Sequence, residues 1–544
     1  MTGYTVLIAA DLTAEGLRVL HNDAQVMLDI IAPNSPSLRE KIKTAHAIIS
    51  RDDVTIDAEM LDMAKNLRVI GRLGTNVAGV DLDVATKRGI IVTHTPGANA
   101  VAAAEHTLTL MLALNRRLIQ AHTSVRDGYW LHDRKRNLGT QLRDKTLGLV
   151  GYGRVGRLVA NLALAFGMQV IAHDPYVGES QRDNERVTLV GLRDLVSRAD
   201  IVSLHIPPTH ETRGLFNETV IRQMKPGAKL INTSHGSIVD ESALAHALRD
   251  EHLAGAAVDV FAEEPPHSSP LVGLECVIHT PHIGDHTVEA QQDVSLLIAT
   301  QVLDALRGED YRNVVNMPFM PGVDYERIYP YLQLAESLGI LQQMLAQHPI
   351  NRVAVEYRGE DMASLVKPLT VALLRGMLKP VLGEKVNYIN APILAQERGI
   401  QVTRTKGLKT GDYTSLVSCE VTWENGSTVV MAGTLLDQRE PHIVQMDQYR
   451  MNFVPRGIML FMGSYDQPGV IGRVGTFMAE NNVNIASWQT GRAEPGGNTL
   501  TVMTLDAPIA DGPLEELRRQ NFVRHAVQVQ IQAFVTDREN EKRH

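Results

Sequence analysis

A short buried strand that runs into a glycine-rich turn and a helix is the feature that most constrains this fold. Residues 146–150 are apolar, and Gly151, Gly153 and Gly156 follow them in the G-x-G-x-x-G spacing. Gly151 permits a tight turn, Gly153 lets backbone N–H groups approach a phosphate, and Gly156 lets a helix pack closely on the strand. A helix is expected over residues 157–166. The pattern predicts a dinucleotide-binding βαβ unit, although glycines at this spacing also occur in ordinary turns.

The start of that helix is expected to hold the phosphates of the dinucleotide. A helix N-terminus offers unpaired N–H groups and the positive end of its dipole, so Arg154 and Val155 join the glycines as predicted cofactor contacts. The next strand, residues 169–172, leads to Asp174. A carboxylate there accepts hydrogen bonds from the adenosine ribose and repels a 2′-phosphate. The predicted cofactor is therefore NAD rather than NADP.

Length and composition narrow the class of protein. The 544 residues suit about three or four domains, and the formal net charge of −9 argues against nucleic acid or a membrane as the partner. The two cysteines, Cys276 and Cys419, cannot hold the fold together by disulfides, which fits a reducing cytoplasm. No signal peptide, membrane-length apolar run or metal site is expected. The basic run at residues 134–136 is either a solvated surface or a contact for an anionic substrate.

Strands and helices alternate on both sides of the dinucleotide unit. Strands are expected at residues 4–9, 47–50 and 67–72, with helices between them, so the chain begins with a parallel sheet. A helix over residues 100–115 leads from this sheet to the cofactor unit, and a helix over residues 287–306 leads back. We therefore expect two lobes around a cleft, with the second lobe inserted into the first.

Two side chains with acid–base chemistry follow predicted strands of the cofactor lobe. Glu264 comes after the strand at residues 255–260, and His282 comes after the strand at residues 276–280. Open parallel sheets bind ligands beyond the carboxyl ends of their strands. Histidine titrates near neutral pH and can exchange a substrate proton, and a carboxylate can orient it. Taken alone, each residue could instead belong to the surface or the core.

The stretch from about residue 50 to residue 315 resembles the D-isomer-specific 2-hydroxyacid dehydrogenases, and in particular their phosphoglycerate dehydrogenase branch. The matching motifs follow the family's order: Gly71-Arg72-Leu73-Gly74-Thr75, Gly89-Ile90-Ile91-Val92, Pro96-Gly97-Ala98-Asn99, Gly151 to Gly156, Val239-Asp240-Glu241, Asp259 to Pro265, Thr280-Pro281-His282 and Glu289-Ala290-Gln291. The resemblance implies hydride transfer between NAD and C2 of a 2-hydroxy acid. It also implies that His282 is the general acid and base and that Glu264 orients it.

The same resemblance assigns further contacts. On the cofactor side it adds Thr75, Thr233, Ser234, Asp259 and Gly284. On the substrate side it adds Gly74, Asn99 and Arg51, the last of which matches one of two arginines that hold a substrate phosphate in some relatives.

The family's third catalytic residue is an arginine, and this chain has His235 in its place. Arginine holds the substrate carboxylate with a permanent charge, whereas histidine is shorter and largely neutral above its pKa. Losing a buried partner of a carboxylate costs about 2–5 kcal/mol, which is roughly a 30- to 5,000-fold loss in transition-state binding. If His235 must be charged, the substrate KM should rise steeply above neutral pH.

Other departures from the family pattern lie on the substrate side: Ile49, Asn76, Ala78, Gly79, His94, Asp285 and His286. Three interpretations follow. The chain interconverts 3-phosphoglycerate and 3-phosphohydroxypyruvate in L-serine biosynthesis, it acts on a different 2-hydroxy acid, or it is a catalytically weakened paralogue that senses NAD or an amino acid.

The C-terminal half reads as two further modules. Residues 373–400 resemble the intervening domain of long-form phosphoglycerate dehydrogenases. From residue 457 the expected element order is βαββαβ, which is the ferredoxin-like pattern. Asp466, Gly469 and Asn484 match an ACT domain, a regulatory module that binds L-serine at a dimer interface in relatives. We expect all three to contact an effector, with Gly469 and Asn484 near a helix start; the alternative is a module that only oligomerises.

Together these expectations give an α/β catalytic region of two lobes and two C-terminal domains. The predicted domains are a flavodoxin-like substrate domain (1–98 and 287–318), an inserted Rossmann NAD-binding domain (99–286), an α+β intervening domain (319–456), a ferredoxin-like ACT regulatory domain (457–532) and a charged, disordered tail (533–544). The expected partners are a small 2-hydroxy or 2-oxo acid, an amino-acid effector such as L-serine, and further copies of the chain in a homodimer or homotetramer.

Overall fold

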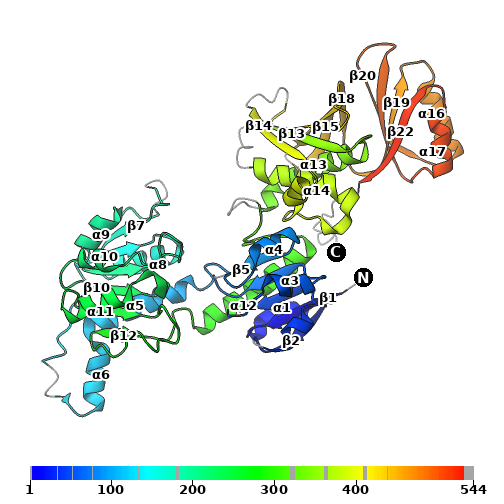
Figure 1. The fold of residues 1–544 in the computed structure, drawn as a ribbon. Helices are drawn as coiled ribbons and strands as arrows, with labels where there is room; N and C mark the ends of the chain where they lie inside the picture. The colour runs from blue at the N-terminus through cyan, green and yellow to red at the C-terminus, as the bar shows by residue number, and fades with distance from the viewer. Residues whose placement is uncertain are drawn as a thin grey trace.

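The chain folds into four sheets that follow one another in sequence, as Figure 1 shows. The structure is a computed structural model that describes residues 3–33, 35–51, 53–75, 77–130, 135–178, 183–318, 325–359, 365–407, 413–437 and 439–531. None of the helices within these ranges is long and apolar enough to cross a lipid bilayer. The predicted tail at residues 533–544 and Arg134 of the basic run lie outside the described residues.

The first sheet is parallel and carries the flavodoxin-like strand order. Its elements are β1 (Tyr4–Ala9), α1 (Ala14–His21), β2 (Val26–Ile30), α2 (Leu38–Lys41), β3 (Ala47–Ser50), α3 (Ala58–Met63), β4 (Val69–Arg72), α4 (Leu82–Lys87) and β5 (Ile91–His94). The order β2-β1-β3-β4-β5 is the doubly wound order in which helices cover both faces. Strands β3 and β4 are therefore buried along their whole length, which explains their unbroken apolar sequence.

Two long helices run between the first and second sheets. Helix α5 (Ala100–Arg116) leaves β5 and packs against the second sheet, and α6 (Leu118–Arg126) extends away from its C-terminus. Helix α12 (Val288–Arg307) returns from the second sheet and packs on α1 and β4. The second lobe is thus inserted into the first, as predicted.

The second sheet has the Rossmann strand order. Its elements are β6 (Thr146–Val150), α8 (Arg154–Ala165), β7 (Gln169–His173), β8 (Val187–Leu189), α9 (Leu192–Arg198), β9 (Ile201–Leu204), α10 (Glu218–Arg222), β10 (Lys229–Asn232), the 3₁₀ helix η2 (Gly236–Ile238), α11 (Glu241–Arg249), β11 (Gly255–Val258) and β12 (Val277–His279). All seven strands are parallel in the order β12-β11-β10-β9-β6-β7-β8. The order reverses between β6 and β9, which is where such sheets bind a dinucleotide.

The third sheet is mixed and is covered by two long helices. Its elements are α13 (Tyr325–Met344), β13 (Ile350–Arg358), α14 (Val366–Leu382), η4 (Gly383–Lys385), α15 (Ala391–Glu397), β14 (Gln401–Gly407), β15 (Leu416–Trp423), β16 (Thr428–Leu436), β17 (Glu440–Met446) and β18 (Tyr449–Phe453). Helices α13 and α14 meet at Gly339 and Gly376, where an added Cβ would lie 2.1 Å from a carbonyl oxygen of the other helix. Only glycine allows the two backbones to come this close.

The fourth sheet has the predicted βαββαβ order. Its elements are β19 (Gly457–Tyr465), α16 (Val470–Glu480), β20 (Ile485–Arg492), β21 (Asn498–Leu505), α17 (Asp511–Arg518) and β22 (Val523–Ile531). The strand order β20-β21-β19-β22 is antiparallel throughout, which confirms the ferredoxin-like fold. One face carries α16 and α17, and the other shares a core with the third sheet, where the rings of Phe453 and Phe461 lie 5.9 Å apart.

Candidate active site

The three glycines of the dinucleotide turn have different surroundings. Gly151 has a φ of +98°, and an added Cβ would lie 2.3 Å from the carbonyl oxygen of His205. An added Cβ at Gly156 would lie 2.2 Å from the carbonyl oxygen of Gly151. At Gly153 no heavy atom lies within 4 Å of that position. The turn therefore needs Gly151 and Gly156 for its own packing, while Gly153 leaves open space where a ligand backbone or phosphate can approach.

Helix α8 begins at Arg154, three residues earlier than predicted. Gly153 caps it, so Gly156 lies inside the first turn rather than before it. Sequence patterns place glycine outside helices because of its low helix propensity, but here close packing on the turn requires it. Val155 is half-buried in this first turn. Arg154 reaches out of the turn and donates a hydrogen bond from Nη1 to the carbonyl oxygen of Pro96 at 2.8 Å, across to the loop before α5.

Asp174 lies just beyond β7, as predicted for the ribose ligand. Its Oδ2 accepts the Tyr152 N–H at 2.9 Å, and its Oδ1 accepts the Tyr176 N–H at 2.9 Å. The carboxylate is half-buried beside the dinucleotide turn. Each oxygen keeps a further lone pair, so the group can still accept from a ribose diol.

His282 and Glu264 come together at the carboxyl ends of neighbouring strands. His282 follows β12 and Glu264 follows β11, and their Nδ1 and Oε2 atoms lie 2.8 Å apart. The side chains are 54% and 38% exposed, so the imidazole can reach a ligand on its Nε2 side. Glu264 is held in turn, because its Oε1 accepts the Phe261 N–H at 3.1 Å. The sequence predicted this pair, and its catalytic role remains a prediction.

The pKa of His282 is raised above its ordinary value. Burial favours the neutral imidazole, but the hydrogen bond that His282 donates to Glu264 and the negative charges of Glu264, Asp259 and Asp285 together outweigh it. A raised pKa keeps a larger share of the imidazole protonated near neutral pH.

Asp259 anchors the loop that carries His282. This carboxylate is 1% exposed and accepts hydrogen bonds from Thr280 Oγ1 at 2.5 Å, from the Ile283 N–H at 2.9 Å and from the Gly284 N–H at 2.8 Å. His106 Nε2 also approaches it at 3.3 Å. Burial raises the pKa of Asp259, but these donors outweigh burial and hold it at about 2.

The anchor keeps His282 in a backbone conformation that few residues adopt. His282 has a φ of +53°, in the left-handed region that costs a non-glycine residue about 1–2 kcal/mol. Its own N–H donates to the Asp259 carbonyl oxygen at 2.9 Å. Asp259 and Gly284 were predicted to contact the cofactor, and in the structure they bind each other to fix the loop.

His235 lies close enough to feel the charges of the His282–Glu264 pair. It caps η2, and its carbonyl oxygen accepts Asn232 Nδ2 at 3.0 Å. An added Cβ at Gly236 would lie 1.9 Å from the carbonyl carbon of Phe261, so the His235 turn packs directly on the loop that carries Glu264. Burial lowers the pKa of His235, the charge of His282 lowers it further, and Glu264 opposes both. His235 is therefore mostly neutral at pH 7, and its charged form is favoured at acid pH.

The side chains next to His235 form hydrogen bonds to other residues of the chain. Ser234 donates from its N–H and from Oγ to Asn232 Oδ1 at 3.1 and 3.0 Å, and Thr233 Oγ1 lies 2.8 Å from Thr107 Oγ1. Both predicted cofactor residues thus lie at the carboxyl end of β10, between the dinucleotide turn and His282.

The predicted substrate contacts already have partners. Arg51 pairs with Asp11 at 3.5 Å and Asp53 at 3.1 Å. The Gly74 N–H donates to Thr95 Oγ1 at 2.8 Å, although Gly74 itself borders open space. These contacts fix the loop around the open position that the sequence assigned to the substrate.

Asn99 also has a partner, and this one was not predicted. Its Nδ2 donates to Asp285 Oδ2 at 2.7 Å. Asn99 caps α5, and Asp285 lies just before α12, so this bond joins the two chain segments that pass between the lobes. The departure from the family at Asp285 was the only sequence signal for it.

Thr75 and His94 form another contact of the first lobe. The Thr75 carbonyl oxygen lies 3.1 Å from His94 Nδ1, which joins the loop after β4 to the end of β5. Burial lowers the pKa of His94, the Thr75 carbonyl opposes this, and the charge of Arg154 lowers it further.

Of the basic run at residues 134–136, Lys135 and Arg136 are exposed.

Two motif residues serve structure rather than ligand binding. Arg72 is fully buried and donates to Ser50 Oγ at 3.0 Å, Val54 O at 2.8 Å and Ala78 O at 2.7 Å. Glu241 accepts the Ala262 N–H at 2.6 Å and so supports the loop that carries Glu264. Their sequence motifs were noticed, but no pattern revealed these partners.

The predicted effector residues do not form one site within the chain. Asp466 and Gly469 lie beyond the carboxyl end of β19, where Tyr465 pairs with Asn498. Asn484 lies at the opposite end of the sheet and donates to Asp506 Oδ2 at 2.6 Å. Seven residues of β21 separate the two ends, which is about 20 Å. The expectation that Asn484 lies near the helix start was wrong, because it follows the end of α16.

Comparisons with known proteins match successive parts of the chain. The D-isomer specific 2-hydroxyacid dehydrogenase NAD-binding domain matches residues 108–284, the D-3-phosphoglycerate dehydrogenase intervening domain matches residues 327–447, and the ACT domain matches residues 458–521.

Whole relatives match as well. D-3-phosphoglycerate dehydrogenase of Synechocystis sp. is 38% identical over 528 residues, covering 97% of this chain and 94% of the relative. The enzyme of the same name from Archaeoglobus fulgidus is 37% identical, covering 97% of this chain and 100% of the relative. A crystal structure of a Thermus thermophilus protein is 38% identical with a TM-score of 0.54, covering 57% of this chain and 99% of that one.

The dinucleotide turn offers a matched pair of substitutions. Gly153→Ala should leave the melting temperature without ligand unchanged, because its Cβ meets no protein atom, but should weaken NADH binding about tenfold or more. Gly156→Ala should lower the melting temperature itself, because its Cβ meets a carbonyl oxygen. Thermal unfolding with and without NADH separates the two effects. Equal NADH-induced stabilisation in wild type and Gly153→Ala would contradict a phosphate site here.

Proposed function

Because the chain belongs to the D-3-phosphoglycerate dehydrogenase branch of the D-isomer-specific 2-hydroxyacid dehydrogenase family, we propose that it interconverts 3-phosphoglycerate and 3-phosphohydroxypyruvate. The chain is an NAD-dependent dehydrogenase. The observation that carries the proposed chemistry is the His282–Glu264 pair, 2.8 Å apart. It lies at the same edge of the parallel sheet as the dinucleotide turn.

The proposed division of labour follows from the protonation of the pair. NAD, when bound, accepts or returns a hydride at C2 of the substrate. His282 Nε2 takes the hydroxyl proton during oxidation and donates a proton to the carbonyl oxygen during reduction. Glu264 accepts from Nδ1, which directs Nε2 at the substrate and stabilises the charged imidazolium. Asp259 holds the loop, so that His282 keeps this orientation.

We assign the two ends of the substrate to different groups. His235 donates a neutral hydrogen bond to the carboxylate, in the place of the family's arginine. Arg51 takes the phosphate. Its ion pairs with Asp11 and Asp53 are solvent-exposed and contribute little, so exchanging them for a phosphate costs little.

A second substrate class is favoured by one feature of the cleft. Asp285 places a carboxylate beside His282, and His235 supplies no positive charge at pH 7. This balance disfavours an anionic substrate compared with a site that holds arginine and no acid. A 2-hydroxy acid with a neutral or hydrogen-bond-donating tail is therefore the alternative substrate.

NADH oxidation by two 2-oxo acids distinguishes the two substrate classes. With 3-phosphohydroxypyruvate, kcat/KM should exceed that with unphosphorylated hydroxypyruvate by about tenfold or more, because a charge-assisted hydrogen bond contributes about 1.5–3 kcal/mol. A higher value with hydroxypyruvate would overturn the phosphorylated substrate in favour of the alternative.

Two variants locate the origin of any preference. Asp285→Asn keeps the shape and removes a negative charge, so it should raise kcat/KM for the phosphorylated substrate more than for hydroxypyruvate. His235→Arg tests the replaced position: a gain indicates that the site has lost an arginine contact, and a loss indicates that it is adapted to histidine.

The pH dependence of reduction reports the His282–Glu264 pair. Reduction needs protonated His282, so kcat/KM should fall as the pH rises through the raised pKa of His282, above its ordinary value of 6.5. Glu264→Gln removes a group that raises this pKa, so the fall should begin at lower pH. Glu263→Gln, at the exposed neighbouring position, is the matched control and should leave the profile unchanged. Coincident profiles for wild type and Glu264→Gln would exclude the assigned role.

We also propose that the chain forms a homo-oligomer through α6. Leu118, Ile119, Val125, Tyr129 and Trp130 expose more than half of their surface around this projecting helix. Light scattering coupled to size exclusion should give a dimer or tetramer, and Ile119→Asp with Trp130→Ser should reduce the mass. Tyr176→Ser, at an exposed aromatic outside this surface, is the control. A monomeric wild type would overturn the proposal.

L-Serine, the proposed effector, would need such an assembly if it uses all three predicted residues. Asp466 and Gly469 lie at the opposite end of the sheet from Asn484. One small molecule can contact both sets only if a second copy supplies one of them. Serine added to the NADH assay tests this: inhibition that disappears in Asp466→Asn supports it, and insensitivity overturns it.

A further inference from the structure

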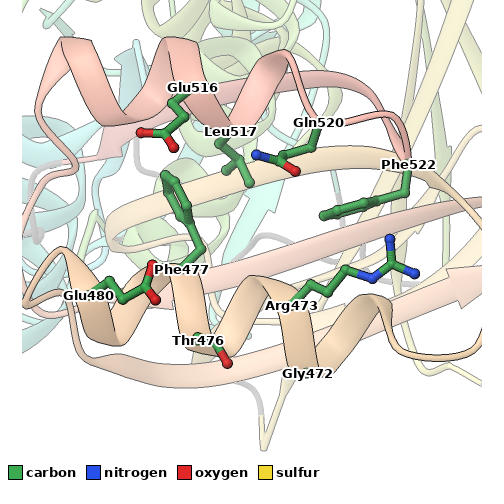
Figure 2. Close-up of a pocket in the computed structure, with 9 residues that line it drawn as sticks. All are labelled: Gly472, Arg473, Thr476, Phe477, Glu480, Glu516, Leu517, Gln520 and Phe522. Atoms are coloured by element: carbon green, nitrogen blue, oxygen red, sulfur yellow. The ribbon is translucent and has the colours of Figure 1, made fainter.

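The ACT domain carries a groove whose arginine end lies beside Gly469, where an added Cβ would be 3.9 Å from Arg473 Nε. It opens between α16 and α17, on the outer face of the fourth sheet, and has a volume of about 480 Å³ (Figure 2). Nine residues line it: Gly472, Arg473, Thr476, Phe477, Glu480, Glu516, Leu517, Gln520 and Phe522. Asp466, Gly469 and Asn484 are not among them.

The floor of the groove is apolar. Phe477, Leu517 and Phe522 are 9%, 0% and 2% exposed and belong to the core of the domain. Their side chains point into the space between the helices, and Phe477 keeps most of the small apolar surface that stays exposed there. An aliphatic or flat segment of a ligand would lose water contact here, which favours binding.

The two ends of the groove carry opposite charges. The Arg473 guanidinium lies 5.1 Å from the centre of the Phe522 ring, at one end. Glu480 and Glu516 lie at the other end, on opposite walls of the groove and one from each helix. Arg473 and Glu480 are seven residues apart on α16, which places their backbones about 10 Å apart along the helix.

Apart from the Phe522 ring under Arg473, these three charges have no side-chain partner in the part of the chain that the structure describes. No hydrogen bond or ion pair joins the side chains of Arg473, Glu480 or Glu516 to another described residue. Gly472 adds no side chain at the arginine end, and no atom lies within 4 Å of where its Cβ would be. Thr476 and Gln520 add neutral donors and acceptors along the wall.

We propose that this groove binds a linear dipolar molecule, with a carboxylate at Arg473, a cationic group at Glu480 and Glu516, and an aliphatic chain over Phe477. Basic amino acids belong to this class. Their α-carboxylate and side-chain cation are separated by an extended aliphatic chain, whereas a short amino acid such as serine cannot reach both ends. Each charged end contributes about two- to fivefold in affinity, because Arg473, Glu480 and Glu516 are exposed to solvent.

Calorimetric titration of the full chain with L-arginine tests the proposal. L-Citrulline has nearly the same shape without the cation and should bind about two- to fivefold more weakly, and this comparison needs no variant. Arg473→Gln and the double variant Glu480→Gln with Glu516→Gln should each weaken arginine binding by a similar factor. Arg519→Gln, at an exposed arginine outside the groove, is the matched control and should bind arginine as wild type does.

Different results of the arginine titration support or overturn the proposal. Arginine binding that is weakened by the groove variants, and by replacing arginine with citrulline, supports the proposal. Absence of binding at millimolar arginine, equal affinity for citrulline, or binding that the groove variants leave intact would overturn it. Circular dichroism of each variant shows that lost binding does not reflect lost folding.

Discussion

The proposed catalytic geometry depends on the hydrogen bonds that the buried Asp259 carboxylate accepts. It accepts two backbone N–H groups and a hydroxyl from the loop after β12, and it lies at the carboxyl end of β11. That loop holds His282 in a left-handed conformation, facing Glu264 from the neighbouring loop. A buried charge is tolerated only when it is fully hydrogen-bonded, so the loop and the carboxylate stabilise each other.

His282 and His235 lie in opposite electrostatic environments. Acidic groups surround His282 and raise its pKa, whereas burial and the charge of His282 lower the pKa of His235. The protonated imidazole is thus concentrated at the residue proposed to exchange the proton. The position proposed to bind the carboxylate then lacks the permanent charge that an arginine would supply.

The C-terminal half is attached to the catalytic lobes by contacts rather than by a linker alone. Asn387 Nδ2 donates to the Gly89 carbonyl oxygen at 2.6 Å, and the rings of Tyr388 and Tyr311 lie 5.8 Å apart. The fourth sheet shares its core with the third. A ligand on the ACT domain therefore acts on a packed surface that continues toward the substrate lobe. The domain boundaries at residues 318, 456 and 532 remain predictions.

The sequence by itself determined the class of fold, the dinucleotide turn, and the pairing of His282 with Glu264. The first two follow from local rules, because strands precede glycine turns and parallel strands bring their carboxyl ends to one edge. The pairing of His282 with Glu264 was implied by the resemblance to the family. Tertiary structure alone decided the early start of α8, the Asn99–Asp285 bond, the burial of Arg72 and the separation of Asn484 from Gly469. Each of these depends on which distant segments pack together, and spacing along the chain does not encode that distance.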